Sequence, residues 1–134
     1  MSFITVVDTP AATLKYHPAE KVVHHEFHTF IYGDAFRDVM NKGVEVLKTR
    51  GAHKWLSDDR GNSATTPEDT EWAANVWFPS AIAAGWKHWA IVMPVKLAGQ
   101  MNMKRRIDQW RAVGVNAEIF ENPESALAWL AKQP

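Results

Sequence analysis

The sequence contains no cysteine among its 134 residues. Disulfide bonds, thiolate nucleophiles and cysteine-ligated metals are therefore excluded, and the absence agrees with a reducing cytoplasm, where we expect the protein to be located. Long apolar runs are also missing, and residues 1–10 show no basic segment followed by an apolar stretch. We therefore expect neither a secretion signal nor stable insertion into a membrane.

The chain carries no net charge, because fifteen Lys and Arg residues balance fifteen Asp and Glu residues. Nucleic-acid binding usually requires an excess of positive charge, so we do not expect it. A Gly-x-Ser-x-Gly motif and a glycine-rich phosphate-binding loop are also missing, which disfavours acyl-enzyme and P-loop chemistry. The sequence contains no complete catalytic constellation, and we expect no cofactor.

Tryptophan, in contrast, is abundant, with seven residues in the chain. An average globular protein of this length contains roughly one per hundred residues. Either an aromatic core or an aromatic contact surface must hold these side chains. The length itself suits one domain over residues 1–134.

The first part of the chain shows the two-residue alternation of β-strands. Three such runs occur at 3–7, 12–16 and 22–28, and the third has Val23, His25 and Phe27 on one face, with His24, Glu26 and His28 on the other. Helical spacing follows over residues 34–50. We expect Asp34 to cap the start of that helix and Gly51 to end it.

The second part repeats a unit of helix, glycine and short apolar strand. Helices are predicted from 67 to 84, from 101 to 113 and after Asn122, with strands at 55–57, 86–93 and 115–120. Pro79 should kink or split the first of these helices near Phe78. The order β-β-β-α-β-α-β-α-β-α predicts an α/β domain with a single mixed sheet, since parallel strands need helical crossovers.

This pattern resembles the SpoIIAA-like fold, which is shared by STAS domains and the lipid-binding Sec14 type, over nearly the whole chain. The segments 55–60, 70–73 and 86–90 are also similar to uncharacterised bacterial proteins of this fold. In STAS anti-sigma-factor antagonists a regulated serine stands at the start of the helix after the fourth strand. The resemblance maps it onto one of four hydroxyl residues, although the Asp-Ser-Ser signature is absent: Ser57, Ser63, Thr65 or Thr66.

The candidate site lies where the strand at 55–57 ends. Ligands of open α/β sheets bind at the carboxyl ends of the strands, and this edge should carry Ser57, Asp58, Asp59, Arg60 and, after a neighbouring strand, Lys96. We expect Lys96 to lie within salt-bridge distance of a carboxylate. Carboxylates beside a lysine are able to bind Mg²⁺ and a phosphate, but a structural role for the acids is favoured.

Two further sets of polar side chains each allow a structural and a functional interpretation. His24, Glu26 and His28 share a strand face and suit Zn²⁺ or Fe²⁺, although a solvated sheet margin would look the same, and we predict no metal site. The run Lys104-Arg105-Arg106 lies on a predicted helix. A solvated face is the favoured interpretation, with an anionic ligand or an acidic partner as the alternative.

The helix after Pro67 carries more aromatic residues than one sheet contact requires. Trp72 adds to the candidate ligand site, while Trp77 and Phe78 are predicted to contact a second copy of the chain in a homodimer. A purely structural role of these aromatic residues in the core is as strong an interpretation as the ligand site and the dimer contact together.

These observations favour a non-enzymatic binding or regulatory module of the SpoIIAA-like type. It would recognise a protein partner or a small amphipathic, largely apolar molecule near the loop and helix of residues 57–72. The alternative is a small Mg²⁺-dependent phosphoryl-handling enzyme or phosphoacceptor that uses Asp58, Asp59 and Lys96.

Overall fold

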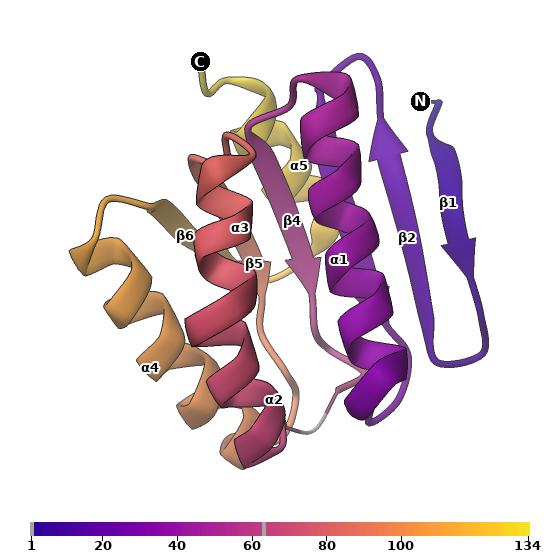
Figure 1. Ribbon diagram of the computed structural model, residues 1–134. Helices are drawn as coiled ribbons and strands as arrows, with labels where there is room; N and C mark the ends of the chain where they lie inside the picture. The colour runs from indigo at the N-terminus through magenta and orange to yellow at the C-terminus, as the bar shows by residue number, and fades with distance from the viewer. Residues whose placement is uncertain (1, 63) are drawn as a thin grey trace.

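The computed structural model describes residues 2–62 and 64–134 and contains one six-stranded sheet in the order β1-β2-β3-β4-β5-β6 (Figure 1). The first three strands pair antiparallel, and β3 to β6 pair parallel. The prediction of an α/β protein with a single mixed sheet is confirmed. The strands are β1 Ile4–Asp8, β2 Ala12–His17, β3 Val22–Phe27, β4 Lys54–Asp58, β5 His88–Val92 and β6 Asn116–Phe120.

The helical segments lie on both faces of this sheet (Figure 1). They are α1 Gly33–Arg50, the continuous series α2 Pro67–Trp72, η1 Ala73–Trp77 and α3 Phe78–Ala83, then α4 Leu97–Ala112 and α5 Pro123–Ala131. The three crossovers connect strands that advance across the sheet in one direction, so right-handed connections bring α1, α2–α3 and α4 to the same face. The last helix, α5, follows the final strand and packs on the opposite face against β3 to β6.

Local signals set most of the helix ends. Thr66 Oγ1 accepts a hydrogen bond from the Asp69 amide at 3.1 Å, and Asn122 Oδ1 accepts one from the Ser125 amide at 2.8 Å, as N-cap residues do. Gly51 ends α1 with a φ of 60°, a left-handed conformation that suits glycine. The helix α4 begins at Leu97, one turn earlier than its apolar spacing suggested.

The start of α1 differs from the prediction that Asp34 caps it. The N-cap position is Tyr32, whose side chain makes no capping bond. Instead, the carboxylate of Asp69 in α2 accepts a hydrogen bond from the Gly33 amide at 2.8 Å and another from Arg37 Nε at 3.1 Å. An acidic residue far along the chain therefore stabilises the N-terminus of α1.

The helical series after Pro67 contains a π-helical turn, η1, which ends at Trp77, two residues before Pro79. The Phe78 amide bonds to the Ala73 carbonyl, five residues back, and Pro79 has no amide to continue an α-helical ladder. One extra residue in this turn lets the series continue past the proline as α3. The expected interruption near Phe78 thus takes the form of a widened turn.

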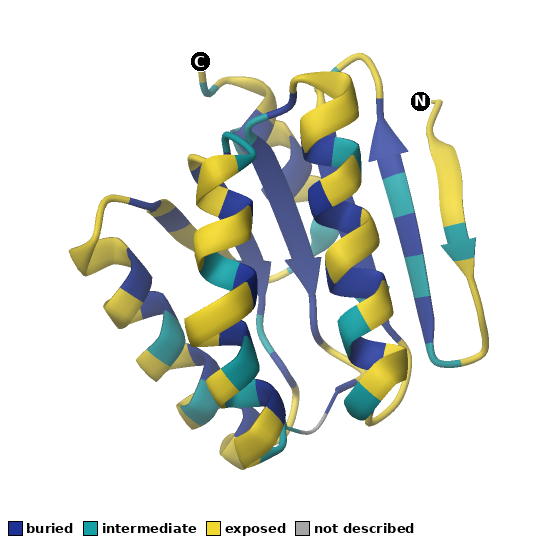
Figure 2. Ribbon diagram, viewed as in Figure 1, coloured by how far each residue is buried: buried dark blue, intermediate teal, exposed yellow. Residues whose placement is uncertain are grey.

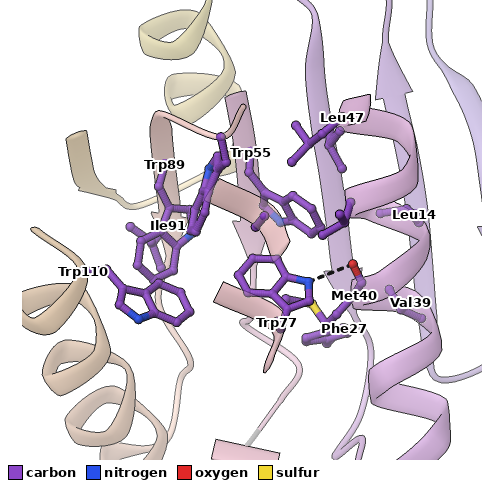
Figure 3. Packing of buried hydrophobic residues seen from close by; sticks show 14 of the residues in the cluster. Leu14, Phe27, Val39, Met40, Leu47, Trp55, Trp77, Trp89, Ile91 and Trp110 are labelled. Atoms are coloured by element: carbon purple, nitrogen blue, oxygen red, sulfur yellow. Dashed lines mark hydrogen bonds between the residues drawn. The ribbon is translucent and has the colours of Figure 1, made fainter. Parts of the chain in front are cut away.

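Tryptophan side chains fill the core between the sheet and these helices (Figure 3). Trp55, Trp77, Trp86, Trp89 and Trp110 are all buried and contact one another through ring pairs whose centroids lie 5.0–6.4 Å apart. A smaller apolar cluster lies on the other face, where Leu56, Ala90 and Val92 pack against α5. The strands β4 and β5 are buried on both faces, whereas β1 is largely exposed (Figure 2).

Candidate functional site

Asp58 and Asp59, at the end of β4, point to opposite faces of the sheet. Asp58 forms a two-bond ion pair with Arg60, with Nε–Oδ1 and Nη2–Oδ2 distances of 2.9 and 2.8 Å. Burial raises the pKa of Asp58, but the hydrogen bonds and charge of Arg60 outweigh it, so the pKa lies below its ordinary value. Because side chains alternate along an extended strand, Asp59 lies on the other face, beneath the helices.

Asp59 belongs to a buried chain of hydrogen bonds that also contains His25 and Trp55. The Trp55 indole N–H donates to His25 Nδ1 at 2.9 Å, and His25 Nε2 lies 2.7 Å from Asp59 Oδ1. Since Nδ1 accepts a hydrogen bond, the neutral imidazole carries its hydrogen on Nε2, and this N–H donates a hydrogen bond to the carboxylate. The tryptophan therefore fixes the tautomer of His25 and aligns it with Asp59.

Ser57 lies beside this chain without completing a catalytic triad. It pairs with His25 across β3 and β4 and accepts a hydrogen bond from Trp89 Nε1 at 2.8 Å. A nucleophilic serine needs a histidine nitrogen that is free to take its proton. Both ring nitrogens of His25 are already engaged, so the arrangement does not support serine-based acyl transfer.

A small cavity lies above His25 and Asp59, between the sheet and the helical layer. The volume open to the centre of a water-sized sphere is about 20 Å³, which is room for about one water molecule. Its wall is mostly aromatic and apolar, with polar groups gathered near the ends of β3 and β4. The residues around it are His25, Phe27, Phe36, Met40, Ser57, Asp59, Asn62, Thr65, Ala73, Trp77, Trp89, Met103, Arg106 and Trp110.

Arg106, Thr65 and Asn62 are polar residues of the cavity wall that lie outside the strands of the sheet. Arg106 in α4 donates to Thr65 Oγ1 at 3.2 Å and stacks over the Trp110 ring at 5.6 Å, and Thr65 in turn donates to Asn102 at 3.1 Å. Asn62 is buried, and its Oδ1 has no hydrogen-bond partner among the described residues. A buried amide oxygen without a donor is costly, so this end of the cavity favours a polar guest.

Burial lowers the pKa of Arg106 below its ordinary value, and the negative charge of Asp59 acts in the opposite direction. The residue is half-buried and borders both the cavity and a hollow on the surface. No carboxylate oxygen of residues 2–62 or 64–134 lies within 4.0 Å of this group. The cavity therefore combines a half-buried cation, a carboxylate bound to histidine and an aromatic wall.

Lys96 lies apart from Asp58 and Asp59. It borders a shallow hollow at the edge of the sheet together with Arg60, Gly61 and Asn62. Within the described part of the chain, its ammonium group has no carboxylate oxygen inside 4.0 Å, contrary to the expected salt bridge. The two acids already have other partners, so the three residues do not form one Mg²⁺ site.

His17, His24 and His28 lie on the antiparallel strands, on the face opposite to His25. His24 contacts His17 with an Nδ1–Nε2 distance of 3.0 Å, and burial together with His17 lowers the pKa of His24 to about 3. His28 instead bonds to Thr13 at 2.8 Å, and Glu26 pairs with Lys15. No group of three metal-ligating side chains was found in residues 2–62 and 64–134.

The hydroxyls that the STAS resemblance singles out are mostly engaged. Ser57 is buried against Trp89, Thr66 caps α2, and Thr65 bonds to both Arg106 and Asn102. Ser63 lies outside the described residues. Ser57 is buried, whereas Thr65 and Thr66 are half-buried.

The aromatic residues of α2, η1 and α3 are more deeply buried than predicted. Trp77 is 1 % exposed and its indole N–H donates to the Met40 carbonyl at 2.9 Å (Figure 3). Its side chain is therefore not available to contact a second subunit, contrary to the expectation. Phe78 is half-buried and stacks on Trp110 at 4.8 Å, while Trp72 is half-buried against Phe36 and Arg37.

Sequence reasoning missed His25 and Arg106 as site residues. Alternation along the third strand placed His25 on the same face as Val23 and Phe27, which is where the structure has it. A histidine among apolar neighbours on that face was the available signal. The sequence predicted Arg106 to be part of a basic helix face. Its position within α4 gave no local signal that its side chain borders the cavity.

No helix in the described part of the chain is long and apolar enough to cross a membrane. Comparisons of the chain with protein-family models, with curated proteins and with solved structures gave no match.

Proposed function

We propose that this protein is a non-enzymatic binding or regulatory module of the SpoIIAA-like type. It recognises a small amphipathic molecule in the cavity beneath the loop and helix of residues 57–72. The observation that carries the proposal is the unpartnered, buried Oδ1 of Asn62 at the polar end of an otherwise aromatic cavity. The sequential order of β3 to β6, with crossover helices on one face, supports the SpoIIAA-like assignment.

An amphipathic ligand fits because the cavity wall has two chemically different ends. Trp77, Trp89 and Met40 offer apolar surface, whereas Asn62, Asp59 and Arg106 offer hydrogen-bonding groups. The cavity as it stands admits only a water-sized guest, so a larger ligand requires side chains to move. Met40 and Met103 are suited to this, since unbranched thioether side chains repack at low cost.

The positions of Asp58, Asp59 and Lys96 argue against the Mg²⁺-dependent alternative. Asp58 is bound by Arg60, Asp59 is bound by His25, and Lys96 lies at a separate hollow. Cation-assisted phosphoryl chemistry needs its carboxylates to converge on one ion. The geometry of the described residues instead directs the two carboxylates apart.

The test uses 2-phenylethanol, a neutral amphipathic probe, and the fluorescence of the buried tryptophans. Five indoles surround or adjoin the cavity, so we expect saturable changes in their emission on titration with the probe. Native mass spectrometry of the purified protein would show any small molecule that it already carries. Linear, unsaturable quenching with no bound species would contradict the proposal.

A matched pair of variants locates the binding. Ala73 is buried in the cavity wall, so Ala73→Leu should fill the space and weaken probe binding by about tenfold or more, equal to about 1.4 kcal/mol. Ala83→Leu makes the same change at an exposed position of α3 and should bind as the wild type does. Equal weakening in both variants would place the probe elsewhere.

A further inference from the structure

We propose that the ligand of this cavity is a carboxylic acid with an apolar body, and that its carboxylate pairs with the guanidinium group of Arg106. This inference rests on the proposed function, because it names the chemical class of the molecule that the cavity binds. It assigns Arg106 as the recognition residue, although Arg106 is one of three consecutive basic residues in the sequence. The apolar body would lie against Trp77, Trp89 and Met40.

The guanidinium group of Arg106 lacks a partner that matches its charge. A guanidinium presents five N–H donors, and only the bond to Thr65 Oγ1 is formed with a side chain among the described residues. Taking a charge out of water is costly unless an opposite charge and hydrogen bonds replace the solvent. A carboxylate supplies both, since it accepts two parallel N–H bonds from the fork of an arginine.

Asp59 is the nearest candidate for an internal partner, but it is engaged with His25. Its Oδ1 accepts the bond from His25 Nε2 at 2.7 Å, and its distance from Arg106 exceeds salt-bridge range. The attraction between Asp59 and Arg106 therefore acts through space, without direct hydrogen bonds. This arrangement leaves the donors of Arg106 available while Asp59 holds the charge of the cavity close to neutral.

Arg106 also lies where a ligand would enter. It borders the inner cavity and, on its other side, a surface hollow of about 60 Å³ between the helical series and α4. The hollow is lined by Thr70, Ala74, Asn102, Arg105, Arg106, Gln109 and Trp110. Because Arg106 and Trp110 separate the two spaces, rotation of the arginine side chain would join them. A carboxylate that enters through the hollow therefore passes Arg106 on its way to the cavity.

The experiment compares phenylacetate with phenylacetamide, which has nearly the same shape and no charge. Binding of each is measured by tryptophan fluorescence and by thermal shift at neutral pH. We expect the wild-type protein to bind phenylacetate at least about tenfold more tightly than the amide, because only the acid forms a charged pair with the guanidinium group of Arg106. If Asp59 repels the acid instead, the amide will bind equally or better, and the inference is overturned.

Three variants assign the preference to Arg106. Arg106→Gln should abolish the preference, so that acid and amide bind with about equal affinity. Arg106→Lys should keep part of the preference for the acid, and Lys104→Gln should leave it unchanged. Lys104 is an exposed residue of the same helix that loses the same charge. The preference is a ratio within one protein, so it remains interpretable if Arg106→Gln is less stable. A preserved preference in Arg106→Gln would contradict the assignment.

The two proposals fail in different ways. If 2-phenylethanol binds in the cavity but the acid shows no advantage over the amide, the binding function stands and the role of Arg106 is refuted. If none of these probes binds saturably at millimolar concentration, the inference is refuted together with the proposed function. The cavity would then be a structural site, and Arg106 and Asp59 would serve the fold alone.

Discussion

At the scale of single residues, most buried polar groups of the described chain have partners on other secondary-structure elements. Three buried indoles illustrate this, because Trp55, Trp77 and Trp89 each donate a hydrogen bond to an acceptor on another strand or helix. An indole N–H must be satisfied when its ring is buried. The tryptophans thus specify how strands and helices meet, as well as contributing apolar surface.

His24 provides the clearest prediction at this scale. Its pKa of about 3 lies below the ordinary value of 6.5, because burial and His17 disfavour the charged ring. Below pH 6.5 the unfolded chain therefore binds a proton that the folded protein does not, and the free energy of unfolding falls as pH falls from about 6.5 towards 3. Between pH 7 and pH 5 we expect His24 to account for a loss of up to about 2 kcal/mol.

Urea unfolding at pH 7 and pH 5 measures this loss. His24→Asn should reduce the difference between the two free energies of unfolding, whatever its effect on stability at pH 7. His28→Asn, on the same strand face but exposed, should retain the wild-type difference. A wild-type protein whose stability is equal at both pH values would contradict the buried, neutral state of His24.

At the scale of elements, close contact between α1 and β4 depends on the absence of one side chain. A Cβ atom added at Gly43 would lie 2.0 Å from Cη2 of Trp55, well inside van der Waals contact. Gly43 is buried in the middle of α1, where glycine weakens a helix by about 1 kcal/mol relative to alanine. Glycine is needed at this position because the Trp55 ring occupies the space that a Cβ atom would fill.

We therefore predict that Gly43→Ala destabilises the protein despite the better helix propensity of alanine. Overpacking of a core usually costs about 1–3 kcal/mol, and the rigid indole ring leaves little room to adjust. Chemical denaturation should show a lower free energy of unfolding for this variant. Asn41→Ala, at an exposed position of the same helix, should be neutral or slightly stabilising. A stabilised Gly43→Ala protein would show that Trp55 is free to move away.

At the scale of the whole molecule, one aromatic cluster holds the helical layer on the sheet. Trp77 of η1 contacts Trp55 of β4 and Trp110 of α4 (Figure 3), and it also contacts Trp86, which lies two residues before β5. Its indole N–H also bonds to the Met40 carbonyl of α1. A single side chain therefore connects the three crossover helices and the central strands.

Trp77→Ala should accordingly lower the free energy of unfolding by about 3–5 kcal/mol, as truncation of a buried aromatic residue does. Because the contacts lie within one chain, the loss in melting temperature should be the same at every protein concentration. Trp129→Ala, outside this cluster and half-buried on α5, should cost less. A loss confined to low protein concentration would instead favour an intersubunit role.

Self-association of the wild-type chain stays a prediction that is independent of Trp77. Sedimentation velocity over a range of micromolar concentrations measures it directly. A dimer should show a concentration-dependent shift towards the monomer on dilution, whereas a single monomeric species at all concentrations would contradict the prediction. In either case the tryptophans named above remain part of the core.

The sequence by itself determined the elements and the type of fold. Alternation on the third strand, the caps at Thr66 and Asn122, the left-handed glycine at position 51 and the interruption before Pro79 all act within a few residues, so local patterns predict them. The edge of the sheet that carries Asp58 and Asp59 was also predictable, because strand ends and turns are local features.

Only the tertiary structure decided which side chains meet. Asp69 reaches the start of α1, Trp55 fixes the tautomer of His25, and Arg106 bonds to Thr65 at the cavity from a helix whose sequence indicates a solvated basic face. Each of these contacts joins residues at least thirty positions apart. Such pairs depend on how helices and strands pack, and packing is set by the shapes of all the buried side chains together.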